Sequence, residues 1–200
     1  MSVYNINMDD TNQSNKQLSN RKKHMRLIVI IILILFSVWV YWGNVSIKTT
    51  QIEIFDAHLP DNFEGFVIAQ VSDLHNVEFG NNQRRLLNAI EKSNPDIIVV
   101  TGDLIDSSHT NIEIAMEFID GAVDIAPVYY ITGNHEAWSD QSDLLHERLL
   151  KAGVILLREE SQKFEKGGQF INLIGIDDPD FTTHGENEYA VSYMTSKKLN

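Results

Sequence analysis

The sequence predicts an α/β domain with a largely parallel sheet, preceded by one apolar segment. Two observations support this prediction. Short β-branched runs alternate with segments of helical spacing between residues 66 and 157, and a charge-free block of 16 residues, 27–42, precedes them. Strands that alternate with helices build parallel sheets. Such sheets carry their functional groups just beyond the carboxyl ends of the strands.

The apolar block, LIVIIILILFSVWVYW, predicts a transmembrane anchor over residues 27–43. A spanning helix needs about 20 apolar residues, and the uncharged residues 43–45 lengthen this block slightly. Its aromatic residues near the end suit a membrane–water interface. A buried core helix and a cleaved signal sequence are the alternatives, but no A-x-A cleavage pattern follows the block, which favours a retained anchor.

The charge distribution predicts how this anchor is oriented. Residues 1–26 are polar and Asn-rich, which is typical of a disordered tail, and they carry a net charge of +3, whereas the rest of the chain carries −15. Basic flanks stay cytoplasmic. We therefore expect a single-pass protein of the cell membrane, with a cytoplasmic tail and an extracytoplasmic domain over residues 45–200. The acidic balance argues against nucleic acid as a partner, and the absence of cysteine is compatible with either compartment.

The expected elements follow in chain order. Alternating apolar residues predict a first strand over residues 47–55. Apolar runs predict strands at 66–71, 97–101, 127–132 and 154–157, and helical spacing predicts helices at 81–93, 111–123 and 141–152. Gly167-Gly168 separates two further strands, 163–165 and 169–176, as a hairpin. A last helix is expected within residues 189–199.

Polar side chains with metal-binding chemistry follow three successive strands of the predicted sheet. Asp73 and His75 follow the first, Asp103 the second, and Asn134 and His135 the third. Side chains two apart on extended backbone point the same way, so Asp73 and His75 are expected to hold one ion together. Singly, each motif is typical of a turn or a helix cap. Their joint placement favours a site for Mn, Fe or Zn, which accept carboxylate, imidazole and amide ligands.

The motifs SDLH, VTGDLID and ITGNHE resemble those of the calcineurin-like metallophosphoesterases, over about residues 66–180. The similarity is greatest to the membrane-associated bacterial branch. The resemblance implies a layered sandwich of two mixed sheets flanked by helices, which binds two divalent metal ions. It also implies hydrolysis of a phosphate ester or pyrophosphate bond by a metal-bridging hydroxide. The implied substrate is a phosphate-containing small molecule or a lipid-linked compound.

The resemblance also implies a role for each motif residue. Asp73 and His75 would bind the first metal, and Asp103 would bridge both metals. Asn134 would bind the second metal and a substrate phosphate. His135 would face the substrate and protonate the leaving group, for which its ordinary pKa of about 6.5 is suitable.

The sequence departs from the family pattern after His135. The family's later motifs, an isolated histidine and then G-H-x-H, have no counterpart, because only His146 and His184 follow. We expect His146 on a helix surface and His184 in a loop. The second sheet is therefore expected to be incomplete, as in a truncated chain, and the second metal site to lack ligands. On this expectation the 200-residue chain alone binds one metal weakly and hydrolyses its substrate slowly or not at all. The alternative function is a catalytically dead, membrane-tethered binding module with the same fold.

Several further polar residues lie near the predicted motifs. We expect Asp106 to cap its loop, residues 177–180 to form a turn that borders the substrate, and Glu136 and Trp138 to shape the surroundings of the leaving group. Two histidines, His58 and His109, are expected in solvated loops.

Overall fold

A computed structural model describes residues 8–181 of the chain. The chain divides into two compact units, Met1–Lys48 and Thr49–Asn200. The described part of the first unit is one helix that begins at Met8, α1 (Met8–Val45). Its segment Asn20–Val40, 21 residues long, is the one described helical stretch that is long and apolar enough to cross a membrane, by length and composition alone.

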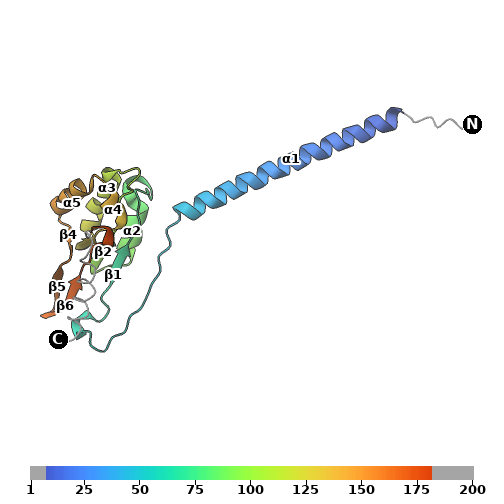
Figure 1. Cartoon of the computed structure of the whole chain (residues 1–200). Coiled ribbons are helices and arrows are strands. Elements are labelled where there is room, and N and C mark those ends of the chain that lie inside the picture. The colour runs from blue at the N-terminus through green and yellow to red at the C-terminus, as the bar shows by residue number, and fades with distance from the viewer. Residues whose placement is uncertain (1–7, 182–200) are drawn as a thin grey trace, which may run out of the picture. The chain divides into compact units, whose positions relative to one another are not determined.

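The second unit is built on a four-stranded sheet that is parallel throughout, in the order β1-β2-β3-β4 (Figure 1). The strands are β1 (Ile68–Val71), β2 (Ile97–Thr101), β3 (Val128–Ile131) and β4 (Ile155–Leu156). The helices that connect them are α2 (Arg84–Lys92), α3 (Ile112–Val123), the short α4 (Asn134–Trp138) and α5 (Ser142–Lys151). Asn111 caps α3, since its Oδ1 accepts the N–H of Glu113 at 3.2 Å. The predicted β-α alternation is confirmed.

The two faces of this sheet are covered by different elements. Ile98 and Val100 of β2 pack on one face, in a core built with residues of α2, α3 and α5. Ile97 and Val99 belong to the other face, where they pack with Phe164 and other residues of an antiparallel hairpin. The hairpin consists of β5 (Ser161–Lys166) and β6 (Gln169–Ile174). The alternation of side chains along β2 thus supplies both cores.

The predicted fold class is confirmed, with one element placed wrongly. The chain is α/β with a parallel sheet and a separate antiparallel pair of strands. No strand forms at residues 47–55: the segment has no pairing among the described residues, and Ile52, Ile54 and Phe55 are 78%, 82% and 89% exposed. Alternation alone does not make a strand when no neighbour covers the apolar side chains. The helix expected within residues 189–199 lies outside the described residues.

Three short 3₁₀ turns lie among the described residues of the domain. They are η1 (Asp61–Phe63), η2 (Asn81–Gln83) and η3 (Pro179–Phe181). The last of them follows β6 and contains part of the acidic stretch predicted as a turn. It contacts α4, which begins directly after β3 and Gly133, so the turn lies beside the third of the predicted motifs.

Candidate metal centre

The loops that follow β1 and β2 are joined by backbone hydrogen bonds. The N–H of Asp73 donates to the Gly102 carbonyl at 3.2 Å, and the N–H of His75 donates to the Asp103 carbonyl at 2.9 Å. Asp73, His75 and Asp103 have φ values of 56°, 46° and 52°. These residues therefore have left-handed backbone, and the extended geometry predicted for Asp73 and His75 is wrong. Such conformations persist because the neighbouring loop holds them.

This backbone nevertheless brings the three side chains together. The Nε2 of His75 lies 3.7 Å from Oδ1 of Asp73 and 3.9 Å from Oδ2 of Asp103. Ligand atoms of all three residues lie within 4.8 Å of one another. Two atoms that bind one ion at about 2.1 Å each are at most about 4.2 Å apart. The two measured N–O separations therefore fit a single divalent ion held by a carboxylate–imidazole–carboxylate set.

Two glycines allow the loops after β2 and β3 to approach. Gly102 has φ +85°, and a Cβ on it would stand 2.5 Å from the backbone nitrogen of Gly133. A Cβ on Gly133 would stand 2.6 Å from the backbone nitrogen of Asp103. Real Cβ atoms do not approach other atoms so closely, so both positions require glycine for space. The close approach places the start of α4 directly beside Asp103.

Glu136 joins the same two loops through its side chain. It is fully buried, and its Oε2 accepts the N–H groups of Asp103 and Gly133, each at 2.8 Å. Its Oε1 accepts those of Leu104 and Ile105 at 2.8 and 3.1 Å. Burial raises the pKa of this carboxyl, while the N–H groups of Gly133, Ile105 and Asp103 oppose the rise because they favour the carboxylate. Glu136 thus acts as a bracket between the β2 and β3 loops.

His135 lies against this bracket and against the ligand set. Its N–H donates to Oδ1 of Asp103 at 2.9 Å, and its ring centroid is 4.4 Å from that of His75. The N–H of Ser107 donates to its Nδ1 at 3.1 Å. Because Nδ1 accepts, the proton of a neutral His135 ring belongs on Nε2.

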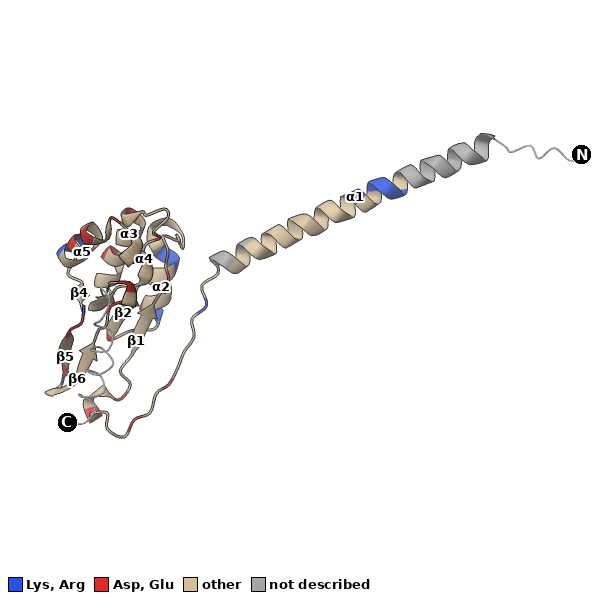
Figure 2. Cartoon of the chain, viewed as in Figure 1, with Lys and Arg blue, Asp and Glu red and all other residues tan. Residues whose placement is uncertain are grey.

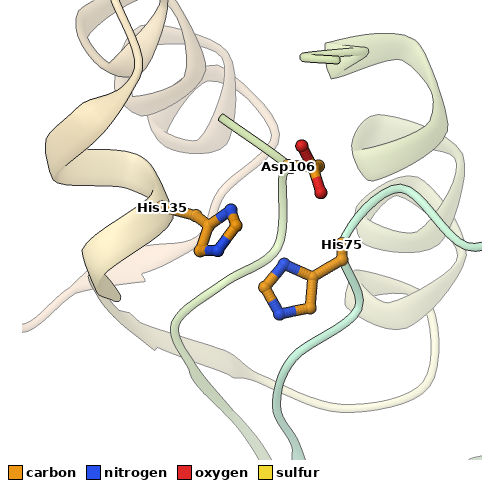
Figure 3. A group of neighbouring side chains, drawn as sticks. All are labelled: His75, Asp106 and His135. Carbon is orange, nitrogen blue, oxygen red and sulfur yellow. The ribbon is translucent and has the colours of Figure 1, made fainter. Parts of the chain in front are cut away.

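Asp106 is a site residue whose proximity to the histidines sequence reasoning missed. Figure 3 shows its carboxylate beside the rings of His75 and His135, and ligand atoms of the three lie within 4.8 Å of one another. Oδ1 of Asp106 accepts the backbone N–H groups of Ser108 and His109, so the predicted capping role is confirmed. The hydrogen bond from Ser108 is the main cause of the lowered pKa of the Asp106 carboxyl. The motif VTGDLID contains both Asp103 and Asp106, and this shared motif could have indicated that Asp106 lies near the site.

The other predicted residues lie as follows. Asn134 is the first residue of α4 and precedes His135. His58 is exposed and pairs with Asp56 at 3.0 Å, and His109 is exposed; both agree with solvated loops. His184 lies outside the described residues.

The surface position predicted for His146 is wrong. His146 is only 7% exposed, and its Nδ1 lies 3.5 Å from the guanidinium of Arg158. Burial lowers the pKa of its imidazole, and the neighbouring guanidinium adds to the effect. Its ring contacts the rings of Tyr130 and Phe181, with centroids 6.1 and 6.2 Å away.

The acidic stretch after β6 is tied to the end of β3. Asp177 is buried and accepts hydrogen bonds from Thr132 Oγ1 at 2.9 Å and from Arg158 Nε at 2.7 Å. Thr132 directly precedes Gly133. The stretch is therefore a fixed part of the surroundings of the third motif, and its buried first carboxylate is already paired.

The chain is similar to known metallophosphoesterases. The family model described as calcineurin-like phosphoesterase matches residues 66–199. A transmembrane protein with metallophosphoesterase domain from Danio rerio is 28% identical over 158 residues, which cover 74% of this chain and 36% of that protein. An uncharacterized metallophosphoesterase from Campylobacter jejuni is 24% identical over 161 residues, which cover 77% of this chain and 41% of that protein.

Among solved structures, the chain is similar to phosphopantetheinyl hydrolase from Mycobacterium tuberculosis. The TM-score is 0.43 at 20% identity, and the match covers 67% of this chain and 51% of that one. The aligned part of this chain thus spans well under half the length of the two curated relatives, at 36% and 41%.

Proposed function

The chain belongs to the calcineurin-like phosphoesterase family, and from this premise we propose that it hydrolyses a phosphate ester or pyrophosphate bond with the help of divalent metal ions. One observation carries the proposal. The ligand atoms of Asp73, His75 and Asp103 converge at the carboxyl edge of the parallel sheet. The carboxyl edge of a parallel sheet is where α/β domains place their functional groups.

Asp73, His75 and Asp103 would hold the first ion, with Asp103 shared with a second ion that Asn134 helps to bind. When bound, such ions neutralise the charge of a phosphate and acidify a water molecule. Carboxylate, imidazole and amide donors suit Mn, Fe or Zn. Asp103 is the central ligand, because its side chain is only 13% exposed and is fixed through Oδ1 by the N–H of His135.

His135 would give a proton to the oxygen of the leaving group. The N–H of Ser107 occupies Nδ1, so the proton is presented on Nε2. The carboxylate of Asp106 lies nearby, with ligand atoms of the two residues within 4.8 Å of each other. A positioned acid of this kind contributes about 10²- to 10⁴-fold to rate.

The helix α1 would anchor this activity at the cell membrane. The proposal rests on the length and composition of Asn20–Val40 and on the basic flank of residues 1–26, which favours a cytoplasmic N-terminus and an extracytoplasmic domain. Membrane attachment brings the site close to lipid-linked phosphates, which are therefore one candidate substrate class beside soluble ones.

Hydrolysis of p-nitrophenyl phosphate and bis-p-nitrophenyl phosphate by the full chain in detergent tests the proposal. We expect activity that needs Mn²⁺, disappears with a chelator and returns when the metal is restored. Asp103→Asn should abolish it together with Mn²⁺ binding, measured by calorimetry. His135→Gln should lower it about 100-fold or more while metal binding persists.

The same experiment separates the enzyme from its alternative. Metal binding without any hydrolysis, in a chain whose unfolding is cooperative, would support the membrane-tethered binding module. Hydrolysis that is indifferent to metal and to Asp103→Asn would refute the proposed mechanism.

A further inference from the structure

Trp138 is an exposed aromatic residue that is nevertheless held in place. Trp138 is 59% exposed, and its Nε1–H donates to Oδ2 of Asp180 at 2.7 Å. A single exposed apolar residue is ordinary on a protein surface. A large ring that is both solvent-accessible and fixed by a hydrogen bond is preorganised for contact with a ligand.

The ring of Trp138 lies beside the ring of His135. Both residues are on α4, three positions apart, so their side chains share one face of the helix. Their ring centroids are 5.3 Å apart and their planes are tilted by 44°. The indole of Trp138 therefore lies next to the imidazole of His135, the group proposed to protonate the leaving group.

The partner of Trp138 is itself fixed to the sheet. The N–H of Asp180 donates to Oδ1 of Asp178 at 2.9 Å, and the N–H of Asp178 donates to Thr132 Oγ1 at 3.4 Å. Thr132 directly follows β3 and precedes Gly133. The position of the indole is thus set by the same strand end that positions His135, and little ordering is needed when a ligand arrives.

Charge indicates which ligands suit this surface. The ionisable side chains beside the His135–Trp138 pair in the described structure include two carboxylates, Asp180 bonded to the indole and Asp106 near the imidazole. Such carboxylates repel a second anionic group on the leaving side. The face of an indole ring favours planar rings in stacked or edge-on contact.

We propose that Trp138 is a specificity-determining residue that contacts a planar, uncharged ring on the leaving group, so that aryl or nucleoside phosphate esters are the preferred substrate class. This inference rests on the proposed function and deepens it. It places the leaving group beside α4 and η3. Of the proposed metal ligands, only Asn134 lies on either of these elements.

Binding of phosphonates that cannot be hydrolysed tests the proposal without any turnover. The chain has three tryptophans, so Trp39→Phe and Trp42→Phe leave Trp138 as the sole indole reporter. The Mn²⁺-loaded full chain is titrated with methylphosphonate, benzylphosphonate and cyclohexylmethylphosphonate. Indole fluorescence reports contact with Trp138, and calorimetry gives the affinities. Trp138→Ala and Trp138→Phe are measured by calorimetry, with Phe170→Ala as the matched control, because Phe170 is a 45% exposed aromatic residue on β6.

We expect benzylphosphonate to bind about tenfold more tightly than methylphosphonate and to change the Trp138 emission. Trp138→Ala should erase this preference and leave methylphosphonate affinity unchanged, Trp138→Phe should keep most of it, and Phe170→Ala should keep all of it. Equal affinities for the benzyl and methyl compounds, or for the benzyl and cyclohexylmethyl compounds, would overturn the inference while the phosphate site stands. Failure of methylphosphonate to bind the metal-loaded chain at all, with no binding of the benzyl compound either, would overturn the proposed function and the inference with it.

Discussion

Glu136 sets the relative position of the metal-ligand loops although it binds no metal in the proposed site. Its two oxygens accept four backbone N–H groups, three of them at 2.8 Å and the fourth, that of Ile105, at 3.1 Å. Such a bracket leaves no periodic signal in a sequence, because the donors are backbone groups that every residue except proline carries. The ITGNHE motif placed Glu136 near the site, but only the folded arrangement gives it this role.

Glu136→Gln should destabilise the domain and weaken the metal site together. A glutamine amide would turn its NH₂ group toward two N–H donors and leave them without an acceptor in a buried place. We expect the free energy of unfolding, measured with urea, to fall by about 2–4 kcal/mol, and Mn²⁺ affinity to fall as well. Glu147→Gln is the matched control, because Glu147 pairs with Lys151 on the exposed surface of α5 and such pairs contribute under about 1 kcal/mol. Equal effects of the two substitutions would contradict the bracket.

His146 predicts how stability depends on pH. Burial lowers the pKa of its imidazole below the ordinary value of 6.5, so the unfolded chain binds more protons than the folded one between these two values. The stability that neutral His146 provides is complete above about pH 7 and is lost as the pH falls through about 6.5. Each pKa unit of lowering corresponds to about 1.4 kcal/mol.

Urea unfolding between about pH 5 and 7 checks this, with His146→Gln as the comparison. Subtracting the two curves removes the opposite contribution of Glu136, whose raised pKa is common to both proteins. The difference in the free energy of unfolding between the unchanged protein and His146→Gln should narrow as the pH falls. A difference that is constant over this range would show that His146 titrates normally.

At the scale of elements, the sequence correctly predicted the strands whose apolar pattern is matched by burial in the fold. Strand β2 was expected at 97–101 and lies there, because a β-branched run is buried on both faces of a parallel sheet. The 47–55 segment shows alternation of apolar and polar residues but has no covering neighbour and forms no strand. Asp73 and His75 were expected to meet and do so, but through left-handed loop backbone. That conformation depends on hydrogen bonds to the β2 loop, which a local pattern cannot reveal.

Gly133 offers a test of how closely the β2 and β3 loops must pack. Its φ is −111°, which any residue adopts, so alanine there meets a steric obstacle only: its Cβ would stand 2.6 Å from the Asp103 nitrogen. We expect Gly133→Ala to weaken Mn²⁺ binding at least tenfold by displacing Asp103, and to cost about 1–3 kcal/mol of stability. Calorimetry and urea unfolding measure both.

Gly153→Ala provides the opposite case. Gly153 has φ +88°, and a Cβ added to it would have nothing within 4 Å, so alanine there carries backbone strain without a collision. It should cost about 1–2 kcal/mol and leave Mn²⁺ affinity unchanged. If Gly153→Ala weakened metal binding as much as Gly133→Ala, the loss would reflect general destabilisation rather than loop packing.

At the scale of the whole molecule, charge is divided along the chain. Figure 2 shows one band of Lys and Arg on α1, whereas acidic and basic residues are mixed over the second unit. The band comprises Arg21, Lys22, Lys23 and Arg26, all exposed, and it lies at the start of the apolar stretch. In a spanning helix such a flank sets the orientation, because basic residues resist translocation.

Cysteine labelling checks the orientation directly, because the chain has no cysteine of its own. We expect a membrane-impermeant maleimide to label Asn172→Cys, on the exposed surface of β6, in intact bacterial cells, and to label Thr11→Cys only after lysis. Resistance to alkaline extraction establishes that the labelled protein is integrated. Replacing the four basic residues by glutamine should make both positions partly reactive, since the orientation then has no strong preference. Labelling of Thr11→Cys alone in intact cells would place the second unit in the cytoplasm, and would turn the search for substrates from extracytoplasmic phosphates to those inside the cell.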